Sequence, residues 1–556
     1  VLVFMFVSGI VGNLFQPPAP FYVMPNTVLH MKLDGNIKES TSSKFEPSLM
    51  GVSSTIGLSD ILYGLEKAEK DDNVQGVFIE LTNPACGYAT STAIRDAINK
   101  FEESGKFVIT YFQGEAISLK HYYIASAANE TYAFPSSVMS FVGIGAELTF
   151  FKGMFDKIGL EMQVIRGSNN DFKSAVEPYF LEKMSDSSKL QLTRYLNNIW
   201  DKVITDVAAE RGLDTNVLNG LANNLKIRRA KDAVKYGLID EVKYRDEVLD
   251  LISLKLNLVD KEEIEFASFE KYAKKKFEDN PNVAVIIAEG GVVKSGDGLS
   301  SNKITKLLKE AREKESIKAV VLRVNSPGGS ALASDEIWRE VKLTNEVKPV
   351  IVSMGDVAAS GGYYIAAAAS RIFAQENTIT GSIGVFGVIP FTGNMLEAKL
   401  GLSFDRVQTN NHAVMSTNKR LDEIEMEAIQ AEVDEIYEDF LQIVADGRNM
   451  SKTNVNEIAR GRVWTGKDAL NVGLVDEIGG LNDAVNYAAE LVNVSDVKVE
   501  YMPKVKIEPW MEILEMLNEE DEKGSLPDAI LDLFYQLKRV ENLHGVQARL
   551  PYFINL

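Results

Sequence analysis

The chain has 556 residues, a net charge of −20, and hydrophobic and charged fractions of 45% and 25%. The length suggests about three or four domains. The two fractions are typical of a globular protein and exclude a disordered, collagenous or coiled-coil chain. The acidic balance argues against a nucleic-acid partner, which needs a basic surface. The single cysteine, Cys86, excludes an internal disulfide and a cysteine-based structural zinc site. The four histidines are too few for a histidine-rich metal site, and we expect no metal and no cofactor.

The chain begins with a short apolar run, VLVFMFVSGIVGNLF. A membrane-spanning helix needs about 20 such residues. We interpret residues 1–15 as the outer end of a truncated membrane anchor; a trimmed secretion signal and a buried core helix are the alternatives. The proline-rich residues 16–27 that follow predict a stiff spacer.

The rest of the chain contains a long internal repeat. Similar segments recur in the same order at offsets of 243, 241 and 236 residues: 61–81 with 304–324, 114–123 with 355–364, and 231–241 with 467–477. A period this long indicates tandem duplication of a whole domain and excludes a short-repeat solenoid.

The repeat divides the chain into two copies of one unit. Copy one is predicted over residues 28–258 and copy two over residues 282–499. The charged stretch 259–281 between them predicts a solvated helical connector. Residues 500–556 form a tail to which composition assigns no function.

Within each copy, short apolar runs alternate with helical periods. In copy two the expected strands are Val283–Ala288, Ala319–Val324 and Val350–Met354, and the expected helices are Asn302–Lys314, Leu332–Lys342 and one opening at Tyr364–Ala369. This alternation predicts an α/β fold with buried, mainly parallel strands.

Two glycine-rich turns follow strands of copy two. Asn325–Ser330 contains Gly328 and Gly329, which allow the backbone to approach a ligand and point N–H groups at it, as in an oxyanion hole or a cradle for a substrate strand. The alternative is an ordinary turn followed by a helix N-cap at Ser330.

The second turn, Ala358–Tyr364, places Ser360 at the start of a helix, where the partial positive charge favours a developing anion. The alternative is that Ser360 only caps the helix. Copy one has Leu119 at the equivalent position and Ala85-Cys86-Gly87 at the first turn. This asymmetry favours a working site in copy two and a degenerate one in copy one.

A serine nucleophile needs a base, and the four histidines are poorly placed for that role. Unshifted, only about one lysine in 2,500 is neutral at pH 7, so a lysine base must be buried. Lys173 is followed by small and apolar residues and is a candidate; the alternative is a surface lysine.

Five segments together resemble the signal peptide peptidase A family in its long, duplicated form. They are Val321–Ser330, Ser353–Tyr364, Thr380–Gly387, Phe172–Pro178 and Val463–Glu477, with a shorter match at Gln547–Tyr552. The resemblance covers nearly all of residues 28–500. It implies two tandem Clp protease/crotonase-like domains and a serine peptidase with a Ser/Lys dyad.

The resemblance also implies roles for individual residues. Ser360 is expected to be the nucleophile, Lys173 the general base and Ser382 the group that orients the lysine. The N–H groups of Gly361, Gly328 and Gly329 are the expected oxyanion donors. Substrates are expected to be released signal peptides and other apolar peptides, hydrolysed by a homotetramer anchored in the bacterial inner membrane and facing the periplasm.

Two other functions remain open at this stage. One is acyl-CoA chemistry on a crotonase-type scaffold, which uses oxyanion-hole groups without a serine nucleophile. The other is a catalytically inactive membrane scaffold. Intact Ser360, Lys173 and Ser382 argue against the scaffold.

Overall fold

The computed structural model describes residues 21–46, 51–275, 278–503 and 546–549. The predicted anchor, residues 1–15, and most of the predicted tail lie outside this part of the chain. Among the described residues, no helix is both long and apolar enough to cross a membrane.

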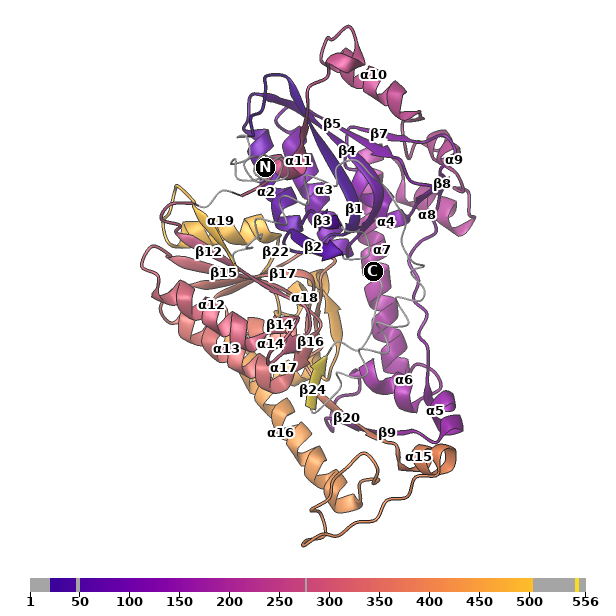
Figure 1. Ribbon diagram of the computed structural model, residues 1–556, viewed down its shortest axis with the longest axis vertical. Helices are drawn as coiled ribbons and strands as arrows, with labels where there is room; N and C mark the ends of the chain where they lie inside the picture. Colours follow the sequence, from indigo (N-terminus) through magenta and orange to yellow (C-terminus); the bar gives the residue numbers. More distant parts are fainter. Residues whose placement is uncertain (1–20, 47–50, 276–277, 504–545, 550–556) are drawn as a thin grey trace, which may run out of the picture.

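Copy one is built on a parallel sheet of six strands covered by helices (Figure 1). Across the sheet the strands are β10 (Glu241–Val242), β7 (Glu130–Ala133), β5 (Phe107–Phe112), β4 (Val74–Ala85), β1 (Thr27–Asn36) and β11 (Phe266–Ser268). Its helices are α2 (Leu58–Glu69), α3 (Tyr88–Glu102), α4 (Leu119–Ala125), α5 (Lys152–Ile158), α6 (Glu177–Phe180), α7 (Asp186–Arg211), α8 (Thr215–Asn223), α9 (Ala230–Lys235), α10 (Arg245–Lys255) and α11 (Phe269–Tyr272). Two short pairs, β2 (Ser42–Glu46) with β3 (Gly51–Thr55) and β6 (Ala116–Ile117) with β8 (Val138–Met139), lie outside the main sheet.

Copy two repeats this strand order. Its parallel strands run β22 (Glu477–Ile478), β18 (Arg371–Ala374), β17 (Val350–Ala359), β15 (Ala319–Ser326), β12 (Val283–Glu289) and β23 (Val499–Met502), and β17 also pairs with β19 (Ile379–Gly381), which pairs antiparallel with β21 (Val463–Thr465). Its helices are α12 (Ser301–Glu313), α13 (Ala331–Asn345), α14 (Gly361–Ala366), α15 (Gly393–Leu400), α16 (Glu423–Arg448), α17 (Lys452–Ile458), α18 (Gly466–Asn471) and α19 (Leu481–Leu491). The matching order confirms the α/β fold and the tandem arrangement expected from the repeat.

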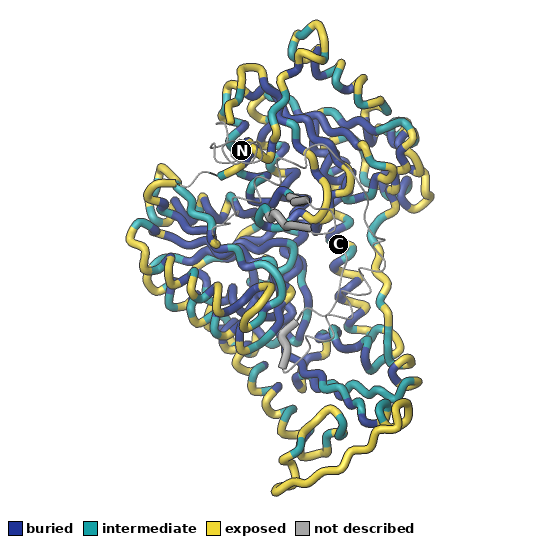
Figure 2. The backbone as a smooth tube through the Cα atoms, in the orientation of Figure 1, coloured by how far each residue is buried: buried dark blue, intermediate teal, exposed yellow. Residues whose placement is uncertain are grey.

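The central strands form the core because their side chains are apolar on both faces. In β12 and β15 nearly every residue is buried, as expected for parallel strands covered by helices on both sides. Figure 2 shows the central strands of each sheet as the buried centre of its copy, with exposed residues on the outer faces of the helices.

The prediction of a solvated helical connector is wrong. Residues 259–275 form a short 3₁₀ turn, strand β11 and the single-turn helix α11. β11 pairs parallel with β1, and Phe269 and Tyr272 of α11 are buried. The segment is rich in charged residues, but the burial of these two aromatic side chains holds it on copy one.

A third, mixed sheet joins the two copies (Figure 1). Its strands run β14 (Leu299–Ser300), β13 (Val292–Val293), β16 (Gly328–Ser330), β24 (Val546–Arg549), β20 (Phe386–Phe391) and β9 (Glu161–Arg166). β9 of copy one pairs antiparallel with β20 of copy two over six residue pairs. The chain leading from β9 toward α6 is thereby held against copy two.

Buried polar groups also cross between the copies. Arg323 donates to Glu39 over 2.8 Å, with both side chains almost fully buried. Asp356 accepts from the backbone N–H groups of Gly87 and Thr90 at the start of α3. Groups buried without partners are costly, so these contacts favour one relative placement of the copies.

Candidate active site

Ser360 lies at a sharp turn between β17 and α14. Its backbone has φ 56° and ψ −117°, a conformation that costs a non-glycine residue on the order of 1–3 kcal/mol. Its side chain makes no capping hydrogen bond to the helix and is fully buried. The alternative that Ser360 serves only as a helix cap is therefore wrong.

The equivalent turn of copy one behaves differently. There Ser118 accepts a hydrogen bond from the His121 N–H over 3.2 Å and caps α4, and Leu119 occupies the position of Ser360. Copy one thus has an ordinary capped helix where copy two has a strained serine.

Lys173 of copy one lies against Ser360 of copy two. It follows β9 and precedes a 3₁₀ turn, Ser174–Val176, and its side chain is fully buried. Its Nζ lies 2.8 Å from Ser360 Oγ, although the two residues are 187 positions apart. The alternative of a surface lysine is wrong.

Ser382 completes the surroundings of the amine. Lys173 Nζ lies 2.8 Å from the Ser382 carbonyl oxygen and 3.0 Å from Ser382 Oγ. Ser382 has φ 51°, again in the left-handed region, and its N–H donates to the Arg462 carbonyl over 2.7 Å. This conformation turns both oxygens of Ser382 toward the same nitrogen.

Burial lowers the pKa of Lys173 well below its usual value near 10.5. A neutral amine has two N–H donors and one lone pair. The Ser382 carbonyl can only accept, and Ser382 Oγ can accept the second N–H. The lone pair then faces Ser360 Oγ and can receive its proton, which is the geometry that a general base requires.

The first glycine-rich turn lies beside the serine. A Cβ on Gly361 would lie 3.1 Å from the Gly329 nitrogen and 3.2 Å from Gly328 Cα. Gly328 has φ 91° and donates its N–H to Ser326 Oγ over 3.2 Å. The structure therefore brings all three predicted glycines together. Ser330 accepts from the Ala333 N–H and caps α13, as its alternative reading expected.

A strand from the tail lies next to these glycines. β24 pairs antiparallel with β16, Gly329 opposite Ala548, and on its other side with β20, Phe386 opposite Gln547. The backbone between β16 and β20 is thus occupied by an extended segment of the same chain.

The three described histidines lie apart from this site. His30 bonds Glu80, the His121 N–H meets Ser118, and His412 lies beside Asp422 and Glu425. The cluster of His412, Asp422 and Glu425 resembles a metal-binding arrangement. However, Lys419 Nζ donates to the Glu425 carboxylate over 2.7 Å and already balances the charge of that carboxylate.

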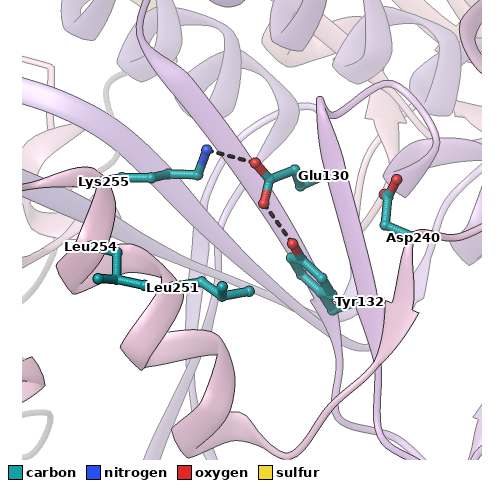
Figure 3. A pocket seen from close by; sticks show the side chains of 6 residues that line it. All are labelled: Glu130, Tyr132, Asp240, Leu251, Leu254 and Lys255. Carbon is teal, nitrogen blue, oxygen red and sulfur yellow. Dashed lines mark hydrogen bonds and ion pairs between the residues drawn. The ribbon is translucent and has the colours of Figure 1, made fainter.

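Figure 3 shows a recess on the copy-one sheet between β7 and α10. There Lys255 pairs with Glu130 over 2.5 Å, and the Tyr132 hydroxyl donates to the same carboxylate over 2.6 Å. Its lining includes none of the predicted site residues, and these polar groups bond one another.

Sequence reasoning missed the backbone groups that hold the site. The Ser382 carbonyl, the Arg460 carbonyl that accepts from the Phe172 N–H, and the pairing of β24 have no side-chain signature. The only sequence signal for β24 was the resemblance of Gln547–Tyr552 to the family, and of this segment the structure describes residues 547–549.

Comparison with known proteins identifies the family of this chain. The Peptidase family S49 profile matches residues 100–258 and 342–495, and the Clp protease profile matches residues 285–379. The chain is 35% identical to Protease 4 of Haemophilus influenzae, over 80% of this chain and 76% of that protein. It is 32% identical to the chloroplastic serine protease SPPA of Arabidopsis thaliana, over 85% of this chain and 70% of that protein.

A solved structure of a ClpP1 mutant from Listeria monocytogenes overlaps 36% of this chain and 93% of its own, with 18% identity and a TM-score of 0.25. The two profile regions, one in each copy, and the extent of the two relatives decide the assignment. The chain belongs to peptidase family S49 and is a serine protease with two S49 regions in tandem.

Proposed function

We propose that this serine protease is a membrane-anchored endopeptidase that degrades cleaved signal peptides and other apolar, extended peptides through a Ser360/Lys173 dyad. The observation that carries the proposal is the buried Lys173 amine, 2.8 Å from Ser360 Oγ and held by both oxygens of Ser382.

The reaction follows from this geometry. Lys173 takes the proton of Ser360 Oγ as that oxygen attacks the scissile carbonyl. The Gly361 and Gly329 N–H groups stabilise the oxyanion, each donor contributing about 2.7–4 kcal/mol. The lysine then gives its proton to the leaving amine. Water, deprotonated by Lys173, attacks the acyl-enzyme and releases the acid and the free serine.

The pairing of β24 supports an extended substrate. A peptide that replaces β24 would add a strand to β16 and β20 at once, a recognition mode based on main-chain hydrogen bonds. Its backbone would then pass the oxyanion donors of β16. Such binding tolerates varied sequences, as disposal of signal peptides requires.

The proposal extends to location and assembly. The apolar residues 1–15 support an N-terminal anchor in the bacterial inner membrane, with both copies on the periplasmic side. The family resemblance supports a homotetramer.

The proposed function is tested with the full chain in detergent micelles. We expect hydrolysis of a fluorogenic signal-peptide sequence, with much slower hydrolysis of a charged peptide of equal length. Short acyl-CoA thioesters are offered in parallel. Turnover of the thioester alone would indicate crotonase-type chemistry, and no turnover of any substrate would indicate an inactive scaffold.

A second prediction concerns β24. Ala548→Pro removes the backbone N–H of Ala548, which lies opposite Gly329 in the β24–β16 ladder, so it should weaken the pairing of β24. We expect KM for a signal peptide to fall about threefold to tenfold, the effect of one net hydrogen bond, with kcat unchanged. Ala548→Ser, which keeps the N–H, is the control. An unchanged KM in Ala548→Pro would show that substrates do not compete with β24.

A further inference from the structure

The segment that carries Lys173 is held by a short stretch of copy two, Arg460–Val463. The Phe172 N–H donates to the Arg460 carbonyl over 3.0 Å, and the Ser382 N–H donates to the Arg462 carbonyl over 2.7 Å. A single stretch of backbone therefore contacts both the lysine segment and the serine that orients the amine.

One side chain joins this stretch to the lysine segment from the other copy. Gln191, on α7 of copy one, is 2% exposed. Its Nε2 donates to the Phe172 carbonyl over 2.9 Å and to Ser174 Oγ over 3.0 Å. Its Oε1 accepts from the Val463 N–H over 3.0 Å. Gln191 thus holds the residues on both sides of Lys173 and the first residue of β21.

The chemistry of an amide suits this position. Both N–H donors and the oxygen of Gln191 are engaged, so no polar atom of the buried amide is left unpaired. A glutamate would keep the acceptor for Val463 but place a carboxylate against the Phe172 carbonyl. A methionine would fill the space and make none of the three bonds.

The contacts continue from Gln191 to the nucleophile. Val463 pairs with Gly381 in the β19–β21 ladder, and the Gly381 carbonyl accepts from the Ser360 N–H over 2.8 Å. Gln191 is therefore connected to Lys173 through Phe172 and Ser174, and to Ser360 through Val463 and Gly381.

Gly461 shows how closely the two copies meet here. It has φ 78°, and a Cβ built on it would lie 2.5 Å from Lys173 Cβ and 2.6 Å from the Lys173 nitrogen. The lysine backbone rests directly on this glycine, so displacement of the Arg460–Val463 stretch would also displace Lys173.

We propose that Gln191 is a positioning residue for the dyad, fixing the Lys173 segment of copy one against the β21–β19 strands that support Ser360 and Ser382. It touches neither substrate nor reacting atoms and acts through the placement of Lys173 Nζ. This inference rests on the proposed Ser360/Lys173 function.

The test is Gln191→Met in the full chain, assayed on the fluorogenic signal peptide over a range of pH. A displacement of about 1 Å can cost about 100-fold in rate, so we expect kcat to fall about 10- to 100-fold with KM within about twofold. The looser amine becomes better hydrated, so the rising limb of the pH profile should move to higher pH. The charged groups packed on this segment are Arg460, paired with Asp171, and Arg462, and both are left unchanged.

Asn198→Leu is the matched control. Asn198 also lies on α7 and also crosses to copy two, donating to Thr465 Oγ1 over 2.9 Å and to Asp468 over 2.7 Å, but it does not contact the Lys173 segment. We expect its kcat and pH profile to match the wild type. If both variants lose stability and neither shifts the pH profile, or if both lower kcat alike, Gln191 has only a structural role and the inference is wrong.

Gln191→Glu is the second variant should Gln191→Met not fold. It is judged on the split between a lowered kcat and an unchanged KM, because its carboxylate would by itself raise the pKa of Lys173 and move the pH profile. The failure of the underlying function is recognised separately. If Ser360→Ala retains activity, the dyad itself is wrong. If Ser360→Ala is inactive while the Gln191 variants keep the wild-type kcat and profile, only the role of Gln191 is wrong.

Discussion

Ser360→Ala is expected to lower kcat for signal-peptide hydrolysis by about 10⁴- to 10⁶-fold, the range for loss of a nucleophile that acts together with its base. Lys173→Met should cause a loss of similar size, because the Ser360 hydroxyl then has no acceptor for its proton. The Ser360→Ala/Lys173→Met double variant should be no slower than the slower single variant. Residues that act as one unit are strongly non-additive, whereas independent contributions would multiply.

The loss must be separated from unfolding. Methionine is close in volume to lysine and replaces a fully buried side chain, so the fold should persist, as judged by circular dichroism. Lys106→Met is a matched control, since the Lys106 amine also contacts backbone carbonyls, those of Ala68, Glu69 and Asp71, and its pKa is also lowered by burial. It lies away from the dyad and should leave kcat within about twofold. Near-normal activity in Lys173→Met would make the dyad assignment wrong.

The second large effect is on pH dependence. In the proposed mechanism the neutral Lys173 amine is the base, and burial places its pKa well below 10.5. Activity should therefore be lost as pH falls through that lowered pKa and should level off above it. Lys173→Arg, whose guanidinium stays charged, should be inactive across the whole range. A wild-type kcat/KM that still climbs steeply at pH 10 would contradict a buried base.

The same shift has a consequence for stability. Between the lowered pKa of Lys173 in the folded state and 10.5 in the unfolded state, the unfolded chain binds the extra proton. The free energy of unfolding should therefore rise with pH through this window. Lys173→Met should lack that contribution, which is measured as the difference between wild-type and variant denaturation curves at each pH. Identical pH dependence in both would show that the amine is not desolvated.

Much of the fold could be predicted from the sequence because its signals are local. Alternating apolar strands and helices, repeated at a nearly constant offset, predicted two tandem α/β units with mainly parallel strands. The turn around Ser360 was also visible, since a strand, a glycine pair and a helix follow one another within a few residues.

The features that escaped prediction depend on distant parts of the chain. β9 pairs with β20, and β24 pairs with β16. These strands are far apart in the sequence, and the sequence periodicity does not indicate which distant strands pair. The connector was predicted wrongly because it contains many charged residues and only a few apolar ones, among them the buried Phe269 and Tyr272 that hold it on copy one. Gln191 looks like any polar residue of a helix until Val463, 272 positions away, is placed beside it.

The central claim is that a lysine from copy one activates a serine of copy two. It is tested most directly by covalent labelling of the full chain with a serine-directed fluorophosphonate, mapped by mass spectrometry and timed in wild type and Lys173→Met. We expect the label on Ser360, and a labelling rate at least about 100-fold lower in Lys173→Met, the lower range for loss of a general base. Labelling of a different serine, or an unchanged rate without Lys173, would contradict the account.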